Sequence, residues 1–483
     1  MMPMHGNRPP MRPNSPGSYF TADDIKLELL RKQRLISPGG VEMYPEVPEM
    51  VDNYRELVPL ENSMVSTSTS FGYVSSVYRA VNISTGEIFC LRRIHGFQAT
   101  MNNYRSLCNA IDSWKKIEHS NMVSLRQIFT TKAFGDNSLI FVYDFFPGSQ
   151  TLMDQIFTHP QIKPFGPSVG GHSSTARPYS QQQPFRNKLL PESVIWTIII
   201  QLSSAIRTIH ANNLACRAID PTKIIITSGG PDNGQGSHYN QFMNPLHLNP
   251  RVRLSSCGVF DVISPNPFPD MPDCPAKALI PHLQREDLVS FGKVLCALAC
   301  NSLSAMDQDS WPQSYEVITR NYNGDLRTLI FFLLTAKRGS TINEIMPMIG
   351  GRFYAQLDMV YQRYDLVESQ LAKELDNGRL FRLLTKLGTI NERPEFRMDP
   401  QWSETGDRYL LKLFRDYIFH QVDENGQPWI DMGHIVSTLN KLDVGSPEKI
   451  CLVSRDDQNV LIVSFCELKK CFEAASNELL RQY

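Results

Sequence analysis

The chain has 483 residues, of which 42% are hydrophobic and 20% charged, and its formal net charge is −1. This length predicts two or three domains with a sizeable core, and the near-neutral charge excludes a global basic field for non-specific binding to nucleic acid or membranes. The ten cysteines include no Cys-x-x-Cys pair, and neither a secretory signal nor an uninterrupted apolar run that would span a bilayer is present. We therefore expect a protein of the reducing cytoplasm with no membrane segment.

The first 60 residues are rich in proline and are expected to be disordered or extended. One short helix is predicted over residues 22–35, where Thr21 provides a cap and Ser37-Pro38-Gly39-Gly40 ends the helical pattern. Residues 38–60, with four further prolines, are predicted to form an extended linker.

Residues 61–350 show the order of elements of a protein kinase. Short strands and one helix come first, then a buried helix over Glu192–Ala211, and then mainly helical material. Two polar inserts, at about 158–188 and 229–249, are expected to be surface loops. The predicted fold is therefore α+β and bilobal. The other predicted segments are strands within 65–94, at 122–125 and at 139–143, a helix over 101–117, and largely helical material over 282–300 and 312–349.

Apolar residues then recur at alternating spacings of four and three, which predicts a coiled coil over 351–390. The same pattern also fits a helix packed on its own domain, and a seam this short is marginal in water without further contacts. The seam positions are Phe353, Leu357, Val360, Tyr364, Val367 and Leu371. Residues 391–483 are predicted to form a small α+β domain, with helices over 409–420 and 432–441 and a hairpin within 450–465.

The central motif has the frame of a kinase catalytic loop without its reactive groups. Cys216-Arg217-Ala218 stands where His-Arg-Asp is expected, and Ala218 cannot accept a proton from a hydroxyl nucleophile. Lys223 replaces the metal-binding Asn, and Ser256-Cys257-Gly258 replaces Asp-Phe-Gly. These substitutions remove the usual magnesium ligands, so we predict a protein that is not an enzyme and has no metal site.

Other kinase positions are kept, or are substituted by residues that could still bind a nucleotide. Arg92 occupies the position of the phosphate-binding lysine, and only Gly72 remains of the three glycines in the phosphate loop. Asp144 to Thr151 follow an apolar strand as an adenine-binding hinge does. Asp287, within Asp-x-x-Ser-x-Gly, is expected to anchor the backbone of the catalytic loop.

Three functions remain open at this point. The favoured hypothesis is a binding platform in which Lys223 and Arg92 neutralise nucleotide phosphates with little or no need for metal. An active kinase with substituted residues and a structural scaffold without nucleotide are the alternatives.

Several stretches together closely resemble one family, the pseudokinase regulatory subunits of the PAN poly(A)-specific deadenylase complex. They are Phe71-Gly72-Tyr73-Val74, residues 90–97, residues 143–147, Cys216-Arg217-Ala218, the heptads and the terminal domain. The resemblance implies a pseudokinase, a coiled coil and a C-terminal knob domain, with ATP bound but no phosphate transferred. By position, the implied nucleotide contacts are Arg92, Asp144, Phe145, Phe146, Pro147, Gly148, Ser149, Gln150, Thr151, Thr222 and Lys223.

The resemblance also implies partners and a location. Family members form homodimers through the coiled coil, recruit the catalytic nuclease subunit through the coiled coil and knob to shorten mRNA poly(A) tails, and dock tryptophans of a glycine-tryptophan-rich silencing scaffold. The cytoplasm, including P-bodies, is the implied location. A CCCH zinc finger and a segment for poly(A)-binding protein are usual in the family, but neither appears in residues 1–60. A fragment or short isoform is therefore expected, and recruitment by poly(A)-binding protein and poly(A) RNA lacks its usual sequence basis here.

Overall fold

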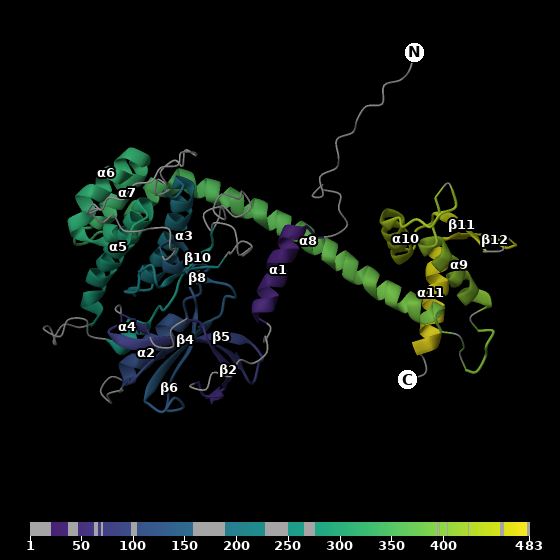
Figure 1. The fold of residues 1–483 in the computed structure, drawn as a ribbon, viewed down its shortest axis with the longest axis horizontal. Helices are drawn as coiled ribbons and strands as arrows, with labels where there is room; N and C mark the ends of the chain where they lie inside the picture. The colour runs from purple at the N-terminus through teal and green to yellow at the C-terminus, as the bar shows by residue number, and fades with distance from the viewer. Residues whose placement is uncertain are drawn as a thin grey trace, which may run out of the picture. The chain divides into compact units, whose positions relative to one another are not determined.

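The computed structural model describes most of the chain in two compact units (Figure 1). The described residues are 21–36, 47–61, 66–68, 71–97, 104–157, 189–227, 250–264 and 276–480, except for 394, 396, 403, 424 and 455–457. One unit, which we call the kinase-like unit, spans residues 26–360. The other, the C-terminal unit, contains residues 361–483 and the start of the chain up to Ile25.

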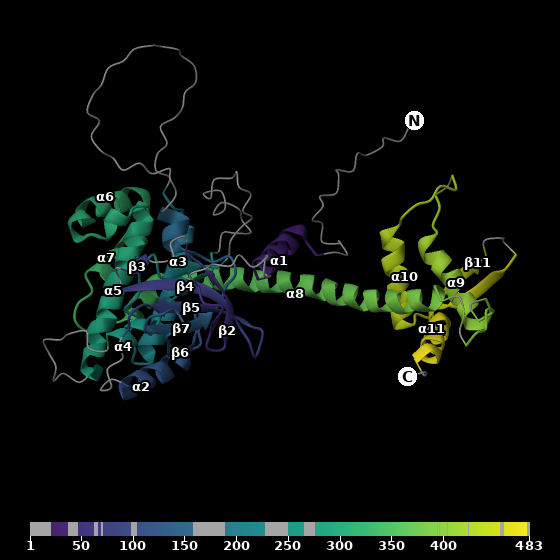
Figure 2. The ribbon, with the colours of Figure 1, turned by 60° about the horizontal axis from the view of Figure 1, so that its bottom comes forward.

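The first lobe of the kinase-like unit is built on a seven-stranded sheet in the order β1-β2-β4-β5-β7-β6, with β3 paired to β4. Every pair in this sheet is antiparallel. One face packs on helix α2, which lies beside β6 (Figure 2). The elements are β1 (Met50–Val51), β2 (Tyr54–Pro59), β3 (Ser66–Ser68), β4 (Tyr73–Asn82), β5 (Ile88–Ile94), α2 (Tyr104–Lys115), β6 (Leu125–Thr131) and β7 (Ser138–Asp144).

Two parts of this lobe differ from the prediction. Residues 50–59, predicted as linker, form β1 and β2, in which Val51, Tyr54 and Leu57 are buried in a cluster with residues of β4, β5 and β7 and the register shifts between Arg55 and Val58. The strand predicted at 122–125 begins only at Leu125, whereas Met122 forms a single parallel bridge to Leu254.

The second lobe is mainly helical and encloses a small sheet in the order β10-β9-β8 (Figure 1). Its central helix α3 (Glu192–Ala211) is long and apolar enough to cross a membrane by length and composition, a possibility that the sequence analysis had excluded. Most of α3 is buried in the protein core, which explains its apolar composition. The other elements are β8 (Gln150–Thr151), the π-helical turn Met153–Phe157, β9 (Ile224–Ile226), β10 (Val252–Leu254), α4 (Val259–Ile263), α5 (Ala276–Cys300), the 3₁₀ turns Leu303–Met306, Gln308–Ser310 and Ile342–Ile345, α6 (Trp311–Asn321) and α7 (Gly324–Leu334).

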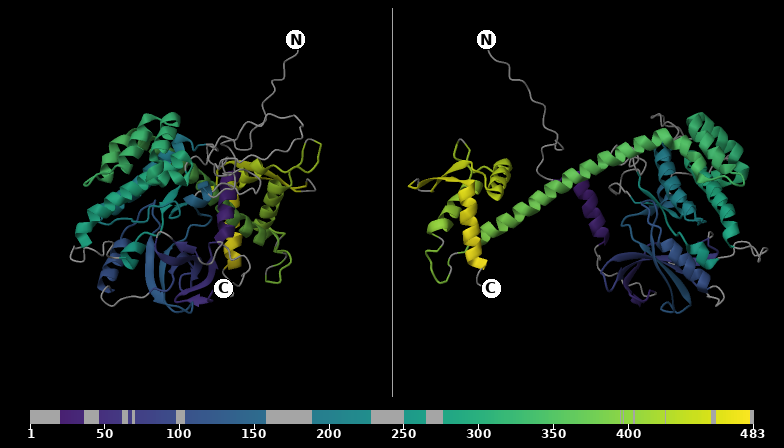
Figure 3. Two further views of the ribbon diagram at one scale, coloured as in Figure 1. Left: turned by 60° about the vertical axis from the view of Figure 1, so that its left-hand side comes forward. Right: turned by 180° about the vertical axis from the view of Figure 1, so that it is seen from behind.

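Helix α8 (Met346–Asn391) begins in the kinase-like unit and ends in the C-terminal unit. Its last turns do not form a free seam, because Leu380, Leu383, Leu387 and Ile390 are buried in the core of the C-terminal unit. That core is completed by the elements drawn in yellow-green and yellow, which gather around one hairpin (Figure 3). They are α9 (Gly406–Phe419), α10 (Met432–Val444), β11 (Lys449–Val453), β12 (Val460–Ser464) and α11 (Phe465–Leu480).

The chain enters its first helix, α1 (Asp23–Ile36), beside α8. The Thr21 hydroxyl donates to Glu374, and the backbone N–H of Ala22 donates to Gln370 Oε1 at 3.0 Å. Side chains of α8 therefore bond the segment that leads into α1. The proline-rich residues 1–20, which we predict to be disordered, and the two polar inserts lie outside the described residues.

Candidate functional site: a kinase-like cleft with substituted catalytic positions

Asp287 on α5 holds the loop that corresponds to a catalytic loop. Its side chain is 1% exposed, and it accepts the backbone N–H groups of Cys216 and Arg217, each at 2.7 Å. His210 Nε2 lies 2.9 Å from the same carboxylate. Arg217 has a φ of 57°, a left-handed conformation that a non-glycine residue adopts at some cost. The buried carboxylate thus holds this strained loop in place.

The positions that would bind a proton or a metal in a kinase carry no carboxylate. Ala218 is buried, and the buried Ser256 has a left-handed φ of 60° with its hydroxyl 3.5 Å from that of Ser255. Among the described residues, no three His, Cys, Asp or Glu side chains gather closely enough to hold a metal ion. Ala218 therefore offers no base for phosphate transfer at the position where a kinase has its catalytic Asp.

Two cations lie together in this cleft. Lys223, immediately before β9, is 6% exposed, and its ammonium donates to Thr222 Oγ1 at 3.0 Å. Burial and then the positive charge of Arg92 on β5 lower the pKa of Lys223 to about 8. Asp220 and Glu61 oppose this shift only partly. In the part of the chain that the structure describes, neither Lys223 nor Arg92 forms an ion pair within 4.0 Å with a carboxylate.

The hinge is joined to these cations through the small sheet. β8, formed by Gln150 and Thr151, pairs with β9, and the N–H of Met153 donates to the carbonyl of Pro221 at 3.0 Å. Because Thr222 and Lys223 follow Pro221 directly, this pairing brings both ends of the predicted site together. Thr151 Oγ1 itself caps the next turn by accepting from the N–H of Asp154 at 3.0 Å.

The predicted hinge residues follow the end of β7 and are braced by two arginines. Arg126 forms a bidentate pair with Asp144, with N–O distances of 2.6 and 2.8 Å. The guanidinium of Arg253, on β10, lies 3.9 Å from the centroid of the Phe146 ring. Burial lowers the pKa of Arg253 to about 10, with a further contribution from Arg251. Phe145, Pro147 and Ser149 are half-buried, whereas Gly148 and Gln150 are exposed.

Aromatic side chains join the segment from Cys257 to Asp261 to β7 and α2. The Tyr143 hydroxyl donates to the carbonyl of Cys257 at 2.8 Å, and the Trp114 ring packs against Gly258, where a Cβ would come within 3.0 Å of it. Trp114 Nε1 donates to Asp261 Oδ2 at 2.6 Å. Burial raises the pKa of Asp261, although Trp114 and Arg217 oppose the rise. Helix α2 and the segment after Gly258 are thereby fixed to each other.

Sequence reasoning missed several of these groups. Arg126 and Arg253 have no counterpart in the kinase motifs, yet an arginine within the apolar stretch Val252-Arg253-Leu254 is a signal of a buried cation. Phe260 and Trp114 carry no such signal, because each contacts a segment far away in the chain: Phe260 packs on Phe71, and Trp114 on α2 donates to Asp261 on α4.

The predicted seam on α8 is largely uncovered. Phe353, Val360, Tyr364, Val367 and Leu371 are 42–62% exposed, and only Leu357 is half-buried. The sequence left open that this helix packs on its own domain. The end of α8, from Leu380 onward, does so, whereas the seam positions do not.

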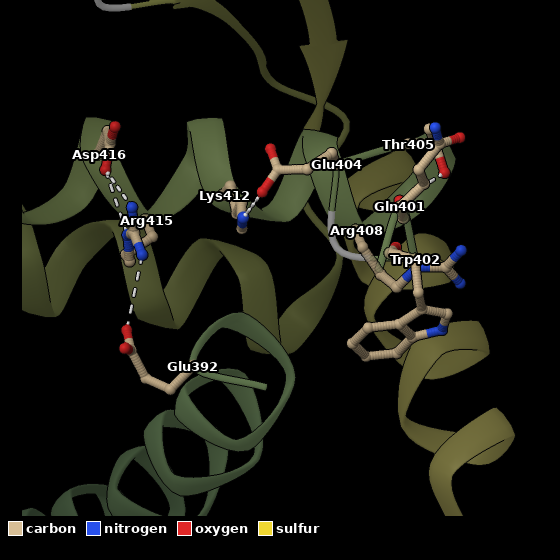
Figure 4. A network of polar contacts seen from close by, with 9 residues as sticks. All are labelled: Glu392, Gln401, Trp402, Glu404, Thr405, Arg408, Lys412, Arg415 and Asp416. Carbon is tan, nitrogen blue, oxygen red and sulfur yellow. Dashed lines mark hydrogen bonds and ion pairs between the residues drawn. The ribbon is translucent and has the colours of Figure 1, made fainter. Parts of the chain in front are cut away.

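A polar network stiffens the C-terminal unit beside the end of α8 (Figure 4). Arg415 Nη2 lies 3.0 Å from Asp416 Oδ1, and its Nη1 lies 3.5 Å from Glu392 Oε1. The guanidinium of Arg408 lies 4.6 Å from the centroid of the Trp402 ring and also donates to the Trp402 carbonyl. These contacts fix the loop before α9 to α9 itself.

A separate pocket of about 380 Å³ lies at the end of α3, lined by residues that include His210, Gln284, Thr341 and Asn343. None of the predicted nucleotide contacts lines it, so size alone does not identify the functional cleft.

The chain is similar to one group of known proteins. The family model described as the Pan3 C-terminal knob domain matches residues 342–479. The PAN2-PAN3 deadenylation complex subunit pan3 of Xenopus tropicalis is 48% identical over 478 residues, covering 97% of this chain and 56% of the relative. The chain spans about half the length of the first curated relatives it matches.

Two solved structures are also similar. The Drosophila melanogaster PAN3 pseudokinase is 44% identical with a TM-score of 0.71, covering 90% of this chain and 100% of that one. PAN3 (pseudokinase and C-term) in a complex with PAN2 (WD40-CS1) from Neurospora crassa is 32% identical with a TM-score of 0.74, covering 94% of this chain and 99% of that one. The predicted fold, a bilobal kinase-like domain followed by a helix and a small α+β knob, is confirmed.

Proposed function

The chain belongs to the PAN3 pseudokinase family, and on this premise we propose that it is a non-catalytic adaptor subunit of a deadenylase complex. In this role it binds ATP in its kinase-like unit and recruits a catalytic nuclease subunit to mRNA for poly(A)-tail shortening. The family relation supports the assembly, and the cleft supports the nucleotide.

The observation that carries the proposal is a catalytic loop that is fully anchored but has no base. Asp287 holds the loop backbone with two hydrogen bonds, while Ala218 replaces the group that would accept a proton. A fixed loop that lacks a catalytic base suits a protein that binds a ligand without reacting with it. The same loop disfavours the active-kinase alternative.

ATP fits the cleft by charge. Lys223 and Arg92 are two adjacent cations without carboxylate partners among the described residues, and a triphosphate would neutralise both. The hinge from Asp144 to Thr151 would take the adenine, and Thr222 offers a hydroxyl beside the phosphates. Because Lys223 stands at a metal-ligand position, we propose that magnesium is not required for binding.

The nuclease subunit is proposed to dock on the C-terminal unit and α8. The Neurospora complex of PAN2 (WD40-CS1) with PAN3 (pseudokinase and C-term) supports this partner for the family. In this chain the hairpin presents an apolar face, where Cys451 pairs with Ile462 and Val453 with Val460, and all four side chains are exposed. Such a face gives a partner apolar area to bury.

A homodimer is proposed to form through the seam of α8. Exposed apolar side chains at heptad spacing are costly in water and are covered when two such helices associate. Val360→Asp should convert a dimer into a monomer in analytical ultracentrifugation, whereas Asp358→Asn, an exposed position on the same helix, should not. A dimer that survives Val360→Asp would contradict the seam.

Further partners follow from the family alone. We propose the glycine-tryptophan-rich silencing scaffold as a ligand and the cytoplasm with P-bodies as the location. Poly(A)-binding protein and poly(A) RNA are partners of the complex for which residues 1–60 supply no motif.

A structural scaffold without nucleotide is the second candidate, and one observation favours it. The Phe71 side chain already lies against both cations, with its ring centroid 4.9 Å from Lys223 Nζ and 5.7 Å from Arg92 Cζ. The cleft is therefore not open toward the two charges in this conformation.

Calorimetric titration with ATP, with and without Mg²⁺, separates these functions. We expect binding in both conditions and its loss in Lys223→Met with Arg92→Met. Absence of binding would favour the scaffold, and strictly magnesium-dependent binding would contradict the metal-free role of Lys223. Phosphate transfer in a sensitive radiolabel assay would overturn the pseudokinase assignment. Ile462→Asp, on the exposed hairpin face, should weaken capture of the nuclease subunit by the full chain while leaving ATP binding unchanged.

A further inference from the structure

Phe71 is an aromatic residue in the phosphate loop that points into the lobe and not to solvent. Its side chain is 4% exposed although Phe71 lies in a turn directly before β4. Three groups from three different segments surround the ring: Arg92 on β5, Lys223 before β9, and Phe260 on α4, whose ring centroid lies 5.2 Å away.

The Phe71 ring provides an electron-rich face that contacts both cations. Cation–π contacts attract an ammonium or a guanidinium to an aromatic ring within about 6 Å, and both cations meet this condition. A phosphate group that contacted Arg92 and Lys223 together would have to lie between them and within hydrogen-bond reach of both. The ring centre already lies close to both, so ring and phosphate compete for the same space.

We propose that Phe71 is an internal gate of the nucleotide site, which covers Arg92 and Lys223 when the site is empty and swings out when phosphates arrive. This inference rests on the proposed ATP binding and adds its regulation. The residue that follows, Gly72, has a φ of +70° and no atom within 4 Å of a built Cβ. A glycine at that position allows the loop to rotate without steric resistance.

The gate also connects the nucleotide site with α4. Phe260 packs on Phe71 and also contacts the guanidinium of Arg217, which lies 5.0 Å from its ring centroid. Departure of Phe71 removes one side of this packing. ATP binding should therefore loosen α4, the short helix at the position where the activation segment of a kinase begins. A partner protein that binds at α4 would then respond to ATP.

The test compares ATP titrations of the full chain, wild type against Phe71→Ala. Removing the gate should tighten ATP binding about tenfold, which corresponds to ~1.4 kcal/mol. In stopped-flow mixing, the wild-type rate should saturate with ATP because the gate must open first, and the Phe71→Ala rate should stay linear. Tyr73→Ala is the matched control, because Tyr73 is exposed and its ring meets Phe97 and not the cations.

The possible outcomes distinguish the Phe71 gate from the proposed ATP binding. Unchanged or weaker binding by Phe71→Ala, with wild-type binding intact, overturns the gate and leaves the ATP site standing. If neither protein binds ATP, the proposed nucleotide function fails and the gate fails with it. Phe71→Leu, which keeps apolar volume but removes the aromatic face, guards against misfolding and should give an intermediate gain. Hydrogen exchange of 259–263 should rise with ATP in the wild type and already be high in Phe71→Ala.

Discussion

Lys223 gives the sharpest prediction, because its side chain is only 6% exposed. Its pKa in the folded protein is about 8, against an ordinary value of 10.5, and the largest cause is burial. Between these two values the unfolded chain binds more protons than the folded one, so stability rises with pH across that window. At pH 7 Lys223 is charged in both the folded and the unfolded protein, so the folded state bears the full free-energy cost of burying the charge.

The cost can be estimated from the shift. A difference of roughly 2.5 pKa units at about 1.36 kcal/mol per unit makes ionised Lys223 unfavourable by on the order of 3 kcal/mol at pH 7. At pH 9.5, which is about one unit below the pKa of Lys223 in the unfolded chain, the cost of burying Lys223 falls to about 1.4 kcal/mol. Lys223→Met removes this cost and also the hydrogen bond to Thr222, which contributes about 1 kcal/mol.

We therefore expect Lys223→Met to stabilise the kinase-like unit by about 2 kcal/mol at pH 7 and by almost nothing at pH 9.5. The measurement is urea unfolding at both pH values, read by pulse proteolysis so that the kinase-like unit is followed separately. Lys132→Met is the control, since Lys132 is exposed. A stability difference that does not change with pH, or a loss of stability at pH 7, would refute the buried-charge reasoning.

Three further predictions test neighbouring parts of the site. Arg92→Gln removes the second cause of the lowered Lys223 pKa, so the rise in stability between pH 7 and 9.5 should become smaller in the same unfolding series; an unchanged rise would contradict the coupling. Asp287→Ala leaves two buried N–H groups without an acceptor and should cost roughly 3 kcal/mol in urea unfolding, and a loss below about 1 kcal/mol would show that the loop is held by other contacts. Gly292→Ala should cost about 1–3 kcal/mol, because its Cβ would lie 2.9 Å from atoms of α7, whereas Gly351→Ala, with open space around it, should be neutral or stabilising in the same assay.

The kinase-like architecture could be predicted because its signals are local. The buried helix Glu192–Ala211 and the hinge after an apolar strand are each defined by neighbouring residues. The strands β1 and β2 were missed because prolines at 48 and 59 flank them, and proline is tolerated at the ends of edge strands. The end of the predicted coiled-coil range, 351–390, differs for a related reason, because it packs into the core of the C-terminal unit. Leucines at 380, 383 and 387 have helical spacing whether they meet a second helix or their own domain, so periodicity cannot distinguish the two.

The chemistry of the site could be predicted only in part. Substitution at fixed motif positions identified Arg92, Ala218 and Lys223 without coordinates. The state of these groups could not be predicted, since burial of Lys223 and the cover by Phe71 depend on packing between segments about 150 residues apart. The braces from Arg126 and Arg253 likewise depend on the pairing of strands.

The cleft combines groups that are individually unfavourable for folding. Lys223 is a buried cation, Arg92 is a second cation beside it, and Arg217 adopts a left-handed backbone conformation. Selection for stability alone would remove such features, because a Met at 223 would pack as well without the charge. The polyanionic ligand proposed above would offset these costs, since its phosphates would attract both cations. On this reasoning ATP binding should raise the pKa of Lys223, so the complex should take up protons between pH 8 and 9.5 and its affinity should fall as pH rises through that range. Titrations in buffers of different ionisation enthalpy measure this uptake, and a proton count of zero would show that Lys223 does not meet the phosphates.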